Sequence, residues 1–390
     1  MSAFGNILGI RMTLLLGLGP VVSPAPLNAM ESIEELEVRQ SMIGDSGFKL
    51  SMRAGRNGPL GLLGPPFVDD PRFQRGARIV VTMWNGIKPT PIFDGIITKT
   101  QYLPGSGENE GRYIMLGRDL TWLMRREQKR VQHPAQDETI IANVITAAYA
   151  AHGIVPVVIP PTVIDPPIPV DRVPQQTCSD WSYLNAMAER HGYKVFLDPG
   201  PAPGVSQLYF GPVPRPGMPQ KPISVNLGPM SDAYDVNVEH DGEILTAARA
   251  KVQDRATGQV AELQIPTSTN TPQSLLVEAL TQMGNTNTKE LTTSGLNSAQ
   301  VLARLMAEVN KTAEKVIKVT GTIDNIRYNA ILKPYHSVQI RGLGMIYNGV
   351  YTVAEVRHVI KQGDYTQTFI LHGDGLYPIV PMVTPEVAAA

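Results

Sequence analysis

Two distant stretches of the chain share one order of residues: FDGIITKTQYLPGSGENEGRYIMLGRDL at 93–120 and YNGVYTVAEVRHVIKQGDYTQTFILHGDGL at 347–376. Each begins with an aromatic residue, an Asp or Asn, a glycine and a β-branched residue, and continues as a strand, a turn and a second strand. A further apolar strand precedes each stretch, at 77–83 and 337–341. Chance similarity of two β-hairpins would explain these features, but their common order favours a duplicated β-barrel unit.

Composition supports a turn-rich protein made mainly of strands. The chain contains 35 glycines and 33 prolines, more than average usage, and both residues are disfavoured inside helices. Short strand patterns separated by glycine turns run from residue 33 to residue 116. We therefore predict a mainly β fold with α+β insertions: two tandem, similar β-barrel (tube-type) domains, an α/β insert and a smaller helical insertion.

Helical patterns interrupt the strands at three places. Apolar residues recur at helical spacing after Asp137, again between a capping sequence at 177–180 and Gly192, and once more at 301–309. Proline-rich tracts at 156–174 and 199–222 are typical of rigid connections. The predicted division is a first barrel at 1–120, an α/β insert at 121–220, a second barrel at 221–255 and 316–378, a helical or loop insertion at 256–315, and a C-terminal tail at 379–390.

Charge balance limits the classes of partner. The 34 basic and 35 acidic residues give a net charge of −1, so we expect no specific nucleic-acid partner. A nearly neutral chain has little electrostatic protection against association, which favours self-assembly. The single cysteine, Cys178, cannot form an internal disulfide. Gly17 interrupts the apolar stretch 12–18, which favours an ordered extended segment over a signal peptide, and no stretch predicts membrane insertion.

Catalytic patterns are missing from the sequence. Gly44-Asp45-Ser46-Gly47 matches the nucleophile sequence of chymotrypsin-like proteases, but no histidine precedes His133, so we interpret it as a hairpin turn. No phosphate-binding loop or dinucleotide fingerprint occurs, and the seven histidines are scattered. We expect no catalytic residue, no cofactor, no metal site and no enzyme activity.

Two further features concern charged and titratable residues. We predict a structural hydrogen-bonding role for His358, which falls within a strand pattern, and a helix C-terminal position for His191. One basic cluster is interpreted as a solvated or subunit-contact face. Its members are Arg118, Arg125, Arg126, Lys129 and Arg130.

Three segments carry a resemblance to one family: the stretch 93–120, the helix that ends at Gly192, and the hairpin at 349–366. The residues that match its motifs are Phe93, Asp94, Gly95, Asp119, Asp180, Trp181, Gly192, Gly349, Tyr351, His358 and Tyr365. In this order and spacing they resemble the phage baseplate hub family, late-control protein D, which includes the hub portion of VgrG proteins and of contractile injection systems.

The resemblance implies a structural hub that forms a homotrimer and adapts a six-fold inner tube to a three-fold spike. The implied partners are further copies of this chain, an inner tube or tube-initiator protein above, a separate spike protein below, and baseplate wedge components. The implied location is a virion tail or contractile particle assembled in the bacterial cytoplasm. Only fourteen residues follow Leu376, so we expect the spike to be a separate protein.

Two other functions remain open at the level of sequence. A tip or adhesin protein of a non-contractile tail would bind a cell-surface glycan, which favours clusters of exposed aromatic residues. Aromatic residues are 6% of the chain and show no such cluster, so we rank this function lower. A cell-wall hydrolase would need two carboxylates in one cleft, and the sequence neither places nor excludes such a pair.

Overall fold

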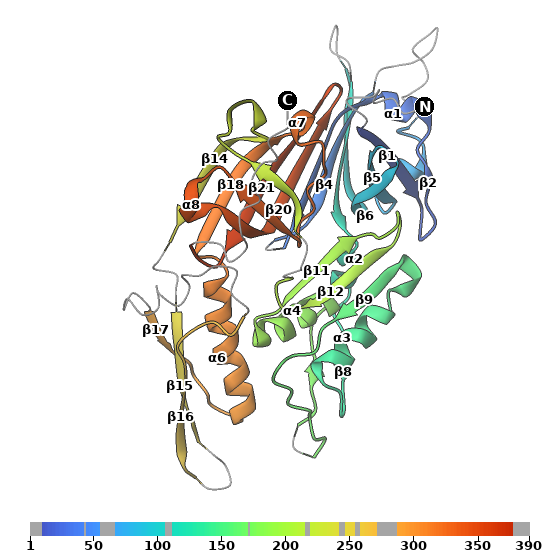
Figure 1. The fold of residues 1–390 in the computed structure, drawn as a ribbon. Helices are drawn as coiled ribbons and strands as arrows, with labels where there is room; N and C mark the ends of the chain where they lie inside the picture. The colour runs from blue at the N-terminus through green and yellow to red at the C-terminus, as the bar shows by residue number, and fades with distance from the viewer. Residues whose placement is uncertain are drawn as a thin grey trace, which may run out of the picture.

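The computed structural model describes residues 10–42, 44–54, 67–105, 111–170, 172–214, 219–241, 246–253, 258–270 and 287–376. One 13-stranded sheet forms the upper part of the molecule, and two smaller assemblies project below it (Figure 1). Along the sheet the strands follow the order β14-β18-β21-β20-β3-β4-β7-β6-β5-β1-β2, with β19 beside β20 and β13 beside β19.

The first half of this sheet folds around its own apolar core. Alternate residues of its strands point inward, and Leu36, Leu50 and Met115 are completely buried. The extended segment predicted at 12–18 is confirmed for residues 12–17, which lie in β1 and pair with β5. The elements are β1 (Ile10–Gly17), β2 (Ser23–Pro24), α1 (Leu27–Glu31), β3 (Ile33–Ser41), β4 (Gly47–Arg53), the 3-10 turn η1 (Pro71–Phe73), β5 (Arg78–Asn85), β6 (Lys88–Leu103) and β7 (Arg112–Asp119).

The second half repeats the strand order of the first around a second core, except that β13 pairs parallel with β19 whereas β1 pairs antiparallel with β5. Its order β14-β18-β21-β20-β19-β13 matches β3-β4-β7-β6-β5-β1 position by position. The mainly β class is therefore confirmed, and the two predicted barrel domains are two similar halves of one continuous sheet. The elements are β13 (Gln220–Ser224), η3 (Gly228–Met230), β14 (Ala233–His240), β18 (Ile317–Asp324), α7 (Asn325–Tyr328), β19 (Ser337–Arg341), α8 (Gly344–Tyr347), β20 (Gly349–Lys361) and β21 (Asp364–Gly373).

The backbone gives the register of the repeat. The pairing register shifts after Ile97 in the β6–β7 ladder and after Val353 in the β20–β21 ladder. Ile97 exchanges two backbone hydrogen bonds with residues 76 and 77, just before β5. Val353 exchanges the same two bonds with residues 335 and 336, just before β19. Ile97 thus corresponds to Val353, and Gly95 to Tyr351.

The sequence alignment of Gly95 with Gly349 was wrong by two residues. Phe93, Asp94 and Gly95 lie within β6, whereas Tyr347 ends α8 and Asn348 precedes β20. The two aromatic-Asx-Gly sequences therefore serve different local structures. They look alike because a glycine suits both a close backbone approach and the start of a strand.

The two halves share one hydrogen-bonded sheet. Strand β20 pairs antiparallel with β3 from Glu355, opposite Ser41, to Lys361, opposite Glu35. Side chains on the outer face add three ion pairs across this junction. They are Arg39–Glu355 at 2.7 Å, Arg357–Glu37 at 2.8 Å and Lys361–Glu35 at 3.5 Å.

The α/β insert contains the first two predicted helices, and both are confirmed. Asp137 and Ser179 accept hydrogen bonds from the first turns of α3 and α4. The sheet β11-β12-β9 was missed by the sequence analysis, because prolines flank its strands and Pro156 lies inside one of them. The elements are α2 (Thr121–Arg125), β8 (Val131–Gln132), α3 (Glu138–Ala147), η2 (Ala150–His152), β9 (Ile154–Val158), β10 (Gln175–Gln176), α4 (Asp180–His191), β11 (Lys194–Pro199) and β12 (Ser206–Gly211).

The second insertion packs one long helix on a small sheet. The elements are β15 (Thr246–Gln253), β16 (Val260–Ile265), β17 (Asn287–Glu290) and α6 (Ser298–Ala313). The predicted helix at 301–309 is confirmed as part of α6, which begins with a capping box of Asn297 and Gln300. The predicted C-terminal tail at 379–390 lies outside the described residues.

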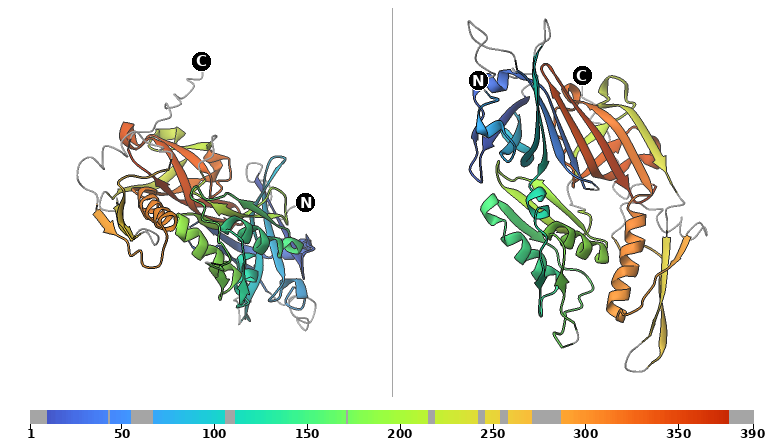
Figure 2. Two further views of the ribbon diagram at one scale, coloured as in Figure 1. Left: turned by 90° about the horizontal axis from the view of Figure 1, so that it is seen from below. Right: turned by 180° about the vertical axis from the view of Figure 1, so that it is seen from behind.

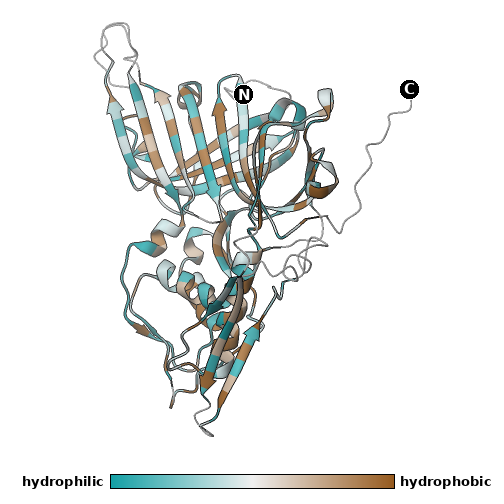
Figure 3. Cartoon of the chain, turned by 90° about the vertical axis from the view of Figure 1, so that its left-hand side faces the viewer, coloured by the Kyte–Doolittle hydropathy of each residue, from teal (hydrophilic) through white to brown (hydrophobic). Residues whose placement is uncertain are grey.

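Both insertions leave the sheet from the same end of its strands. Six successive antiparallel pairings separate β14 from β7, so the two strands run in the same direction and end on the same side. The α/β insert follows β7 and the helical insertion follows β14, and Figure 2 shows both on one side of the sheet. Figure 3 shows hydrophilic and hydrophobic segments alternating along the strands of the sheet above them.

Replacing Gly95 by alanine should destabilise the first half, because a Cβ there would lie 2.2 Å from the carbonyl oxygen of Arg118. We expect a loss of about 1–3 kcal/mol in the free energy of unfolding, measured by urea denaturation. Gly19→Ala is the matched control, because a Cβ at Gly19 meets nothing within 4 Å. Equal stability of the two variants would contradict this account of Gly95.

Candidate functional site

Asp94 lies at a buried contact between the first half of the sheet and the α/β insert. Its carboxylate forms a two-pronged ion pair with Arg78, with Nε–Oδ1 at 2.8 Å and Nη2–Oδ2 at 2.6 Å. The two side chains, Arg78 and Asp94, are only 3% and 1% exposed. Ser206 of the insert donates to Asp94 at 3.0 Å, and Arg78 donates to the carbonyl of Gly204 at 2.9 Å. This cluster therefore fixes the insert against β5 and β6.

The neighbours of Asp94 in its motif serve the packing of the same strand. Phe93 lies in the first core, edge to face with Phe48 at a centroid distance of 5.2 Å. Gly95 lies opposite Asp119 in the ladder between β6 and β7. The residues that match the family motif in the first half thus meet on two neighbouring strands.

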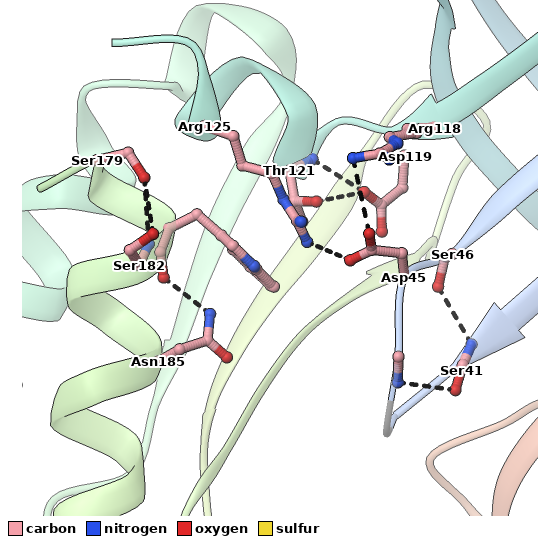
Figure 4. Close-up of polar contacts among 12 residues, drawn as sticks. Ser41, Asp45, Ser46, Arg118, Asp119, Thr121, Arg125, Ser179, Ser182 and Asn185 are labelled. Carbon is pink, nitrogen blue, oxygen red and sulfur yellow. Dashed lines mark hydrogen bonds and ion pairs between the residues drawn. The ribbon is translucent and has the colours of Figure 1, made fainter. Parts of the chain in front are cut away.

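Asp119 lies where β7 turns into α2. Its carboxylate accepts hydrogen bonds from the backbone and hydroxyl of Thr121, and burial raises the pKa of Asp119 to about 6. Figure 4 shows Asp45 from the neighbouring turn beside it, facing Arg118 and Arg125. Residues 44–46 lie between β3 and β4, as predicted for a hairpin turn, and Gly47 begins β4. Asp45 supplies the ion pairs of this turn.

The predicted basic cluster is divided by burial: Arg118, Arg126 and Arg130 are exposed, whereas Arg125 and Lys129 are half-buried. Arg125 pairs with Asp45 at 2.5 Å and stacks over the ring of Trp181 at 5.1 Å. Arg126 lies over Trp122, and Lys129 reaches the buried carboxylate of Asp180. These cations contact aromatic rings and acids within the chain because the turn after β7 folds onto α4.

Asp180 organises the α/β insert from the first turn of α4. It is 2% exposed and accepts hydrogen bonds from Lys129 at 2.6 Å, Tyr149 at 2.7 Å and Gln176 at 2.7 Å. Burial opposes ionisation, but these three donors hold the pKa of Asp180 below its ordinary value. Four segments of the insert therefore meet at one carboxylate.

Gly192 ends α4 where the two insertions touch. Its backbone has the left-handed conformation, with φ of 69°, and a Cβ there would lie 2.9 Å from the Cα of Ala307 in α6. Farther along, Asp165 accepts hydrogen bonds from Asn297 at 2.9 Å and Gln300 at 2.7 Å at the start of α6. The insertions are thus joined at two places along α6.

The motif residues of the second half lie along β20 and β21. Gly349 begins β20 opposite Ile340, and Tyr351 is buried with its hydroxyl donating to the carbonyl of Tyr347 at 2.6 Å. Burial raises the pKa of Tyr351 above its ordinary range. These contacts anchor the start of β20 to α8.

His358 and Tyr365 form a buried pair where the two halves join. Nδ1 of His358 lies 2.9 Å from the hydroxyl of Tyr365, and Nε2 has no hydrogen-bond partner among the described residues. Burial lowers the pKa of His358 to about 3, so the imidazole is neutral at pH 7. His358 corresponds to Tyr102 of the first half under the backbone register.

The sequence analysis missed the partners of these residues. Arg78, Ser206, Lys129 and Tyr149 come from segments separate from the motifs that they contact. A signal was visible only for the ion pairs between β3 and β20. Acidic and basic residues alternate with apolar ones in both strands, which marks one polar face on each.

The described part of the chain holds no group of three or more His, Cys, Asp or Glu side chains that could bind a metal ion. Among these residues, no helix has the length and apolar character needed to cross a bilayer.

Removing the charge of Asp94 should destabilise the protein strongly, because Arg78 would remain buried without a counter-ion. We expect Asp94→Asn to lower the free energy of unfolding by about 3–5 kcal/mol, measured by urea denaturation. Glu290→Gln removes the half-exposed pair with Arg249 and should cost less than about 1 kcal/mol. Similar losses for both variants would rule out the anchoring role of Asp94.

His358 should make the fold sensitive to acid. Its pKa is about 3 in the folded chain and 6.5 when unfolded, so its contribution is complete above pH 6.5 and declines as the pH falls toward 3. Between pH 6 and pH 4, the free energy of unfolding of the native chain should fall more steeply than that of His358→Gln. The difference should approach about 1.4 kcal/mol per pH unit. Parallel pH profiles would show that His358 is not buried in its neutral form.

Solved structures with this fold include tail proteins. The tail protein from Neisseria meningitidis MC58 has a TM-score of 0.62 and 13% identity, over 94% of this chain and 98% of that one. The 43 kDa tail protein of prophage MuSo2 from Shewanella oneidensis has a TM-score of 0.62 and 12% identity, over 93% and 98%.

A third similar structure is the E. coli c3393 protein, described as a component of the type VI secretion system with structural similarity to T4 tail proteins gp27 and gp5. It has a TM-score of 0.52 and 10% identity, over 91% of this chain and 77% of that one. At these identities the likeness establishes the fold. No curated protein sequence matches the chain.

Membership of the late-control protein D family stays a prediction. A different family model matches residues 66–362, which is more than half of the 390 residues. Its description, Alg8_N or Alg8 N-terminal domain, names no reaction. By this match, the chain belongs to the Alg8 N-terminal domain family.

Proposed function

We propose that the chain is a structural hub of a contractile tail or injection machine, and that it works as a homotrimer between a six-fold tube and a three-fold spike. The observation that carries this proposal is the identical strand order in the two halves of one continuous sheet. The fold shared with solved tail proteins supports the same role.

The two ends of the strands differ in a way that suits an adapter. At one end of the strands, β6 connects to β7 in the first half, and the corresponding strands β20 and β21 connect in the second half. The opposite end of the strands carries the two insertions, which have different folds. Three chains would therefore present six pairs of corresponding strands on one side and a three-fold set of insertions on the other.

This polarity assigns the partners. The inner tube or a tube initiator would bind the end of the strands where β6 connects to β7 and β20 to β21. A separate spike protein would bind the side of the insertions. Baseplate wedge components would contact the outside of the ring. We propose a role without enzymatic activity, in a tail or particle assembled in the bacterial cytoplasm, because the residues that match the family motif anchor strands and insertions to one another.

The test is the mass of the purified chain in solution, alone and with a candidate spike protein, by sedimentation or light scattering. We expect a particle of three times the chain mass of 42.4 kDa, either alone or on addition of the spike. A chain that stays monomeric with tube and spike proteins present would overturn the proposal.

A further inference from the structure

Strand β20 has two partners along the same edge. Its first residues, Gly349–Thr352, pair with β19, and from Glu355 to Lys361 it pairs with β3 of the other half. The neighbouring half thus continues the ladder where β19 stops. This junction is what joins the two halves into one sheet.

The corresponding edge of β6 has only the first of these partners. Strand β5 pairs with β6 from Lys88 to Ile96, and residues 76 and 77 bind Ile97. From Lys99 to Leu103, no further strand pairs with this edge in the described part of the chain. Strand β14, which corresponds to β3, likewise pairs only with β18 among the described strands.

Burial differs between the halves where a neighbouring strand would lie. His358 is 0% exposed beneath the junction, whereas its counterpart Tyr102 is 41% exposed. Val38 of β3 is also 0% exposed, whereas its counterpart Val238 of β14 is only partly buried. The first half and β14 therefore both expose apolar surface that the junction buries elsewhere.

The charges at these two edges are complementary. The ladders place Asn237 and Glu239 of β14 at the positions of Glu37 and Arg39 of β3. Lys99 of β6 takes the position of Glu355. The pair Arg39–Glu355 thus corresponds to Glu239 and Lys99, with both charges reversed. Lys99 is exposed and has no ion pair within the described residues, whereas Glu239 contacts Lys318 at 3.0 Å.

We propose that β6 of one chain pairs antiparallel with β14 of a second copy, and that this contact repeats the β20–β3 junction between chains. Gln101 then lies opposite Glu239 of the partner subunit, as Arg357 lies opposite Arg39. Lys99 forms an ion pair with the same glutamate. Each chain contributes β6 on one side and β14 on the other, so the contact is head to tail and closes into a ring. This inference rests on the ring assembly of the proposed function.

Disulfide trapping tests the register of the junction. In a Cys178→Ser background, the pair Gln101→Cys and Glu239→Cys should link chains into dimers and trimers on non-reducing gels, because facing residues of paired strands lie within disulfide reach. The pair Arg39→Cys and Arg357→Cys is the positive control, and it should form a disulfide within one chain. The pair Lys49→Cys and Glu239→Cys is the negative control, since both residues are exposed but lie on strands that do not meet in this junction.

Charge reversal tests the predicted ion pair without a cysteine. Lys99→Glu should weaken assembly by about two- to five-fold per junction, and adding Glu239→Lys should restore it. Lys49→Glu has the same change of charge on β4, which β7 separates from β6, and should leave assembly unchanged.

The outcomes separate this inference from the proposed function. Native trimers in which the Gln101→Cys and Glu239→Cys pair forms no cross-link, or an equal effect of Lys99→Glu and Lys49→Glu, would overturn the β6–β14 junction and leave the trimeric hub standing. A chain that is monomeric in every variant and with its partners present would overturn both.

Discussion

Strand β20 pairs with β3 over seven residues, and three ion pairs cross the same junction on the outer face. A strand edge without a partner exposes backbone donors and acceptors, so each half would offer such an edge if it folded alone. The junction pairs these two edges with each other within one chain. It also gives β7 and β14 the same direction, so that both insertions leave from the same end of the strands. Among the described strands, β6 beyond Ile97 and the outer side of β14 have no such partner.

The insertions depend on a second kind of contact, in which one buried carboxylate collects donors from distant segments. Asp94 holds Arg78 and Ser206, and Asp180 holds Lys129, Tyr149 and Gln176. Such groups are costly to bury unless every partner is present, so they specify one arrangement of the insert against the sheet more than they add stability. The proposed hub would need this rigidity, because its insertions would have to keep their positions relative to the ring.

The fold was predictable where the pattern is local. The helices after Asp137 and Ser179 follow from capping residues and apolar spacing, and β20 and β21 follow from alternation around the turn at Gly363. The strands β9, β11 and β12 were not, because prolines within and between them conceal the alternation. The partners of Asp94 and Asp180 were not either, because no local pattern records a contact between residues far apart in the chain.

The mainly β composition, the relation between two stretches and the positions of the helices could all be inferred from the amino-acid sequence, because these properties depend on spacing between near neighbours. The register of the repeat required the fold, since similar aromatic-Asx-Gly sequences lie inside β6 and at the start of β20. It also decided that the halves share one sheet and that His358 is buried while Tyr102 is partly exposed. The physical reason is that backbone pairing and burial depend on which strand lies alongside, and for β6 that neighbour is absent from the chain's own described strands.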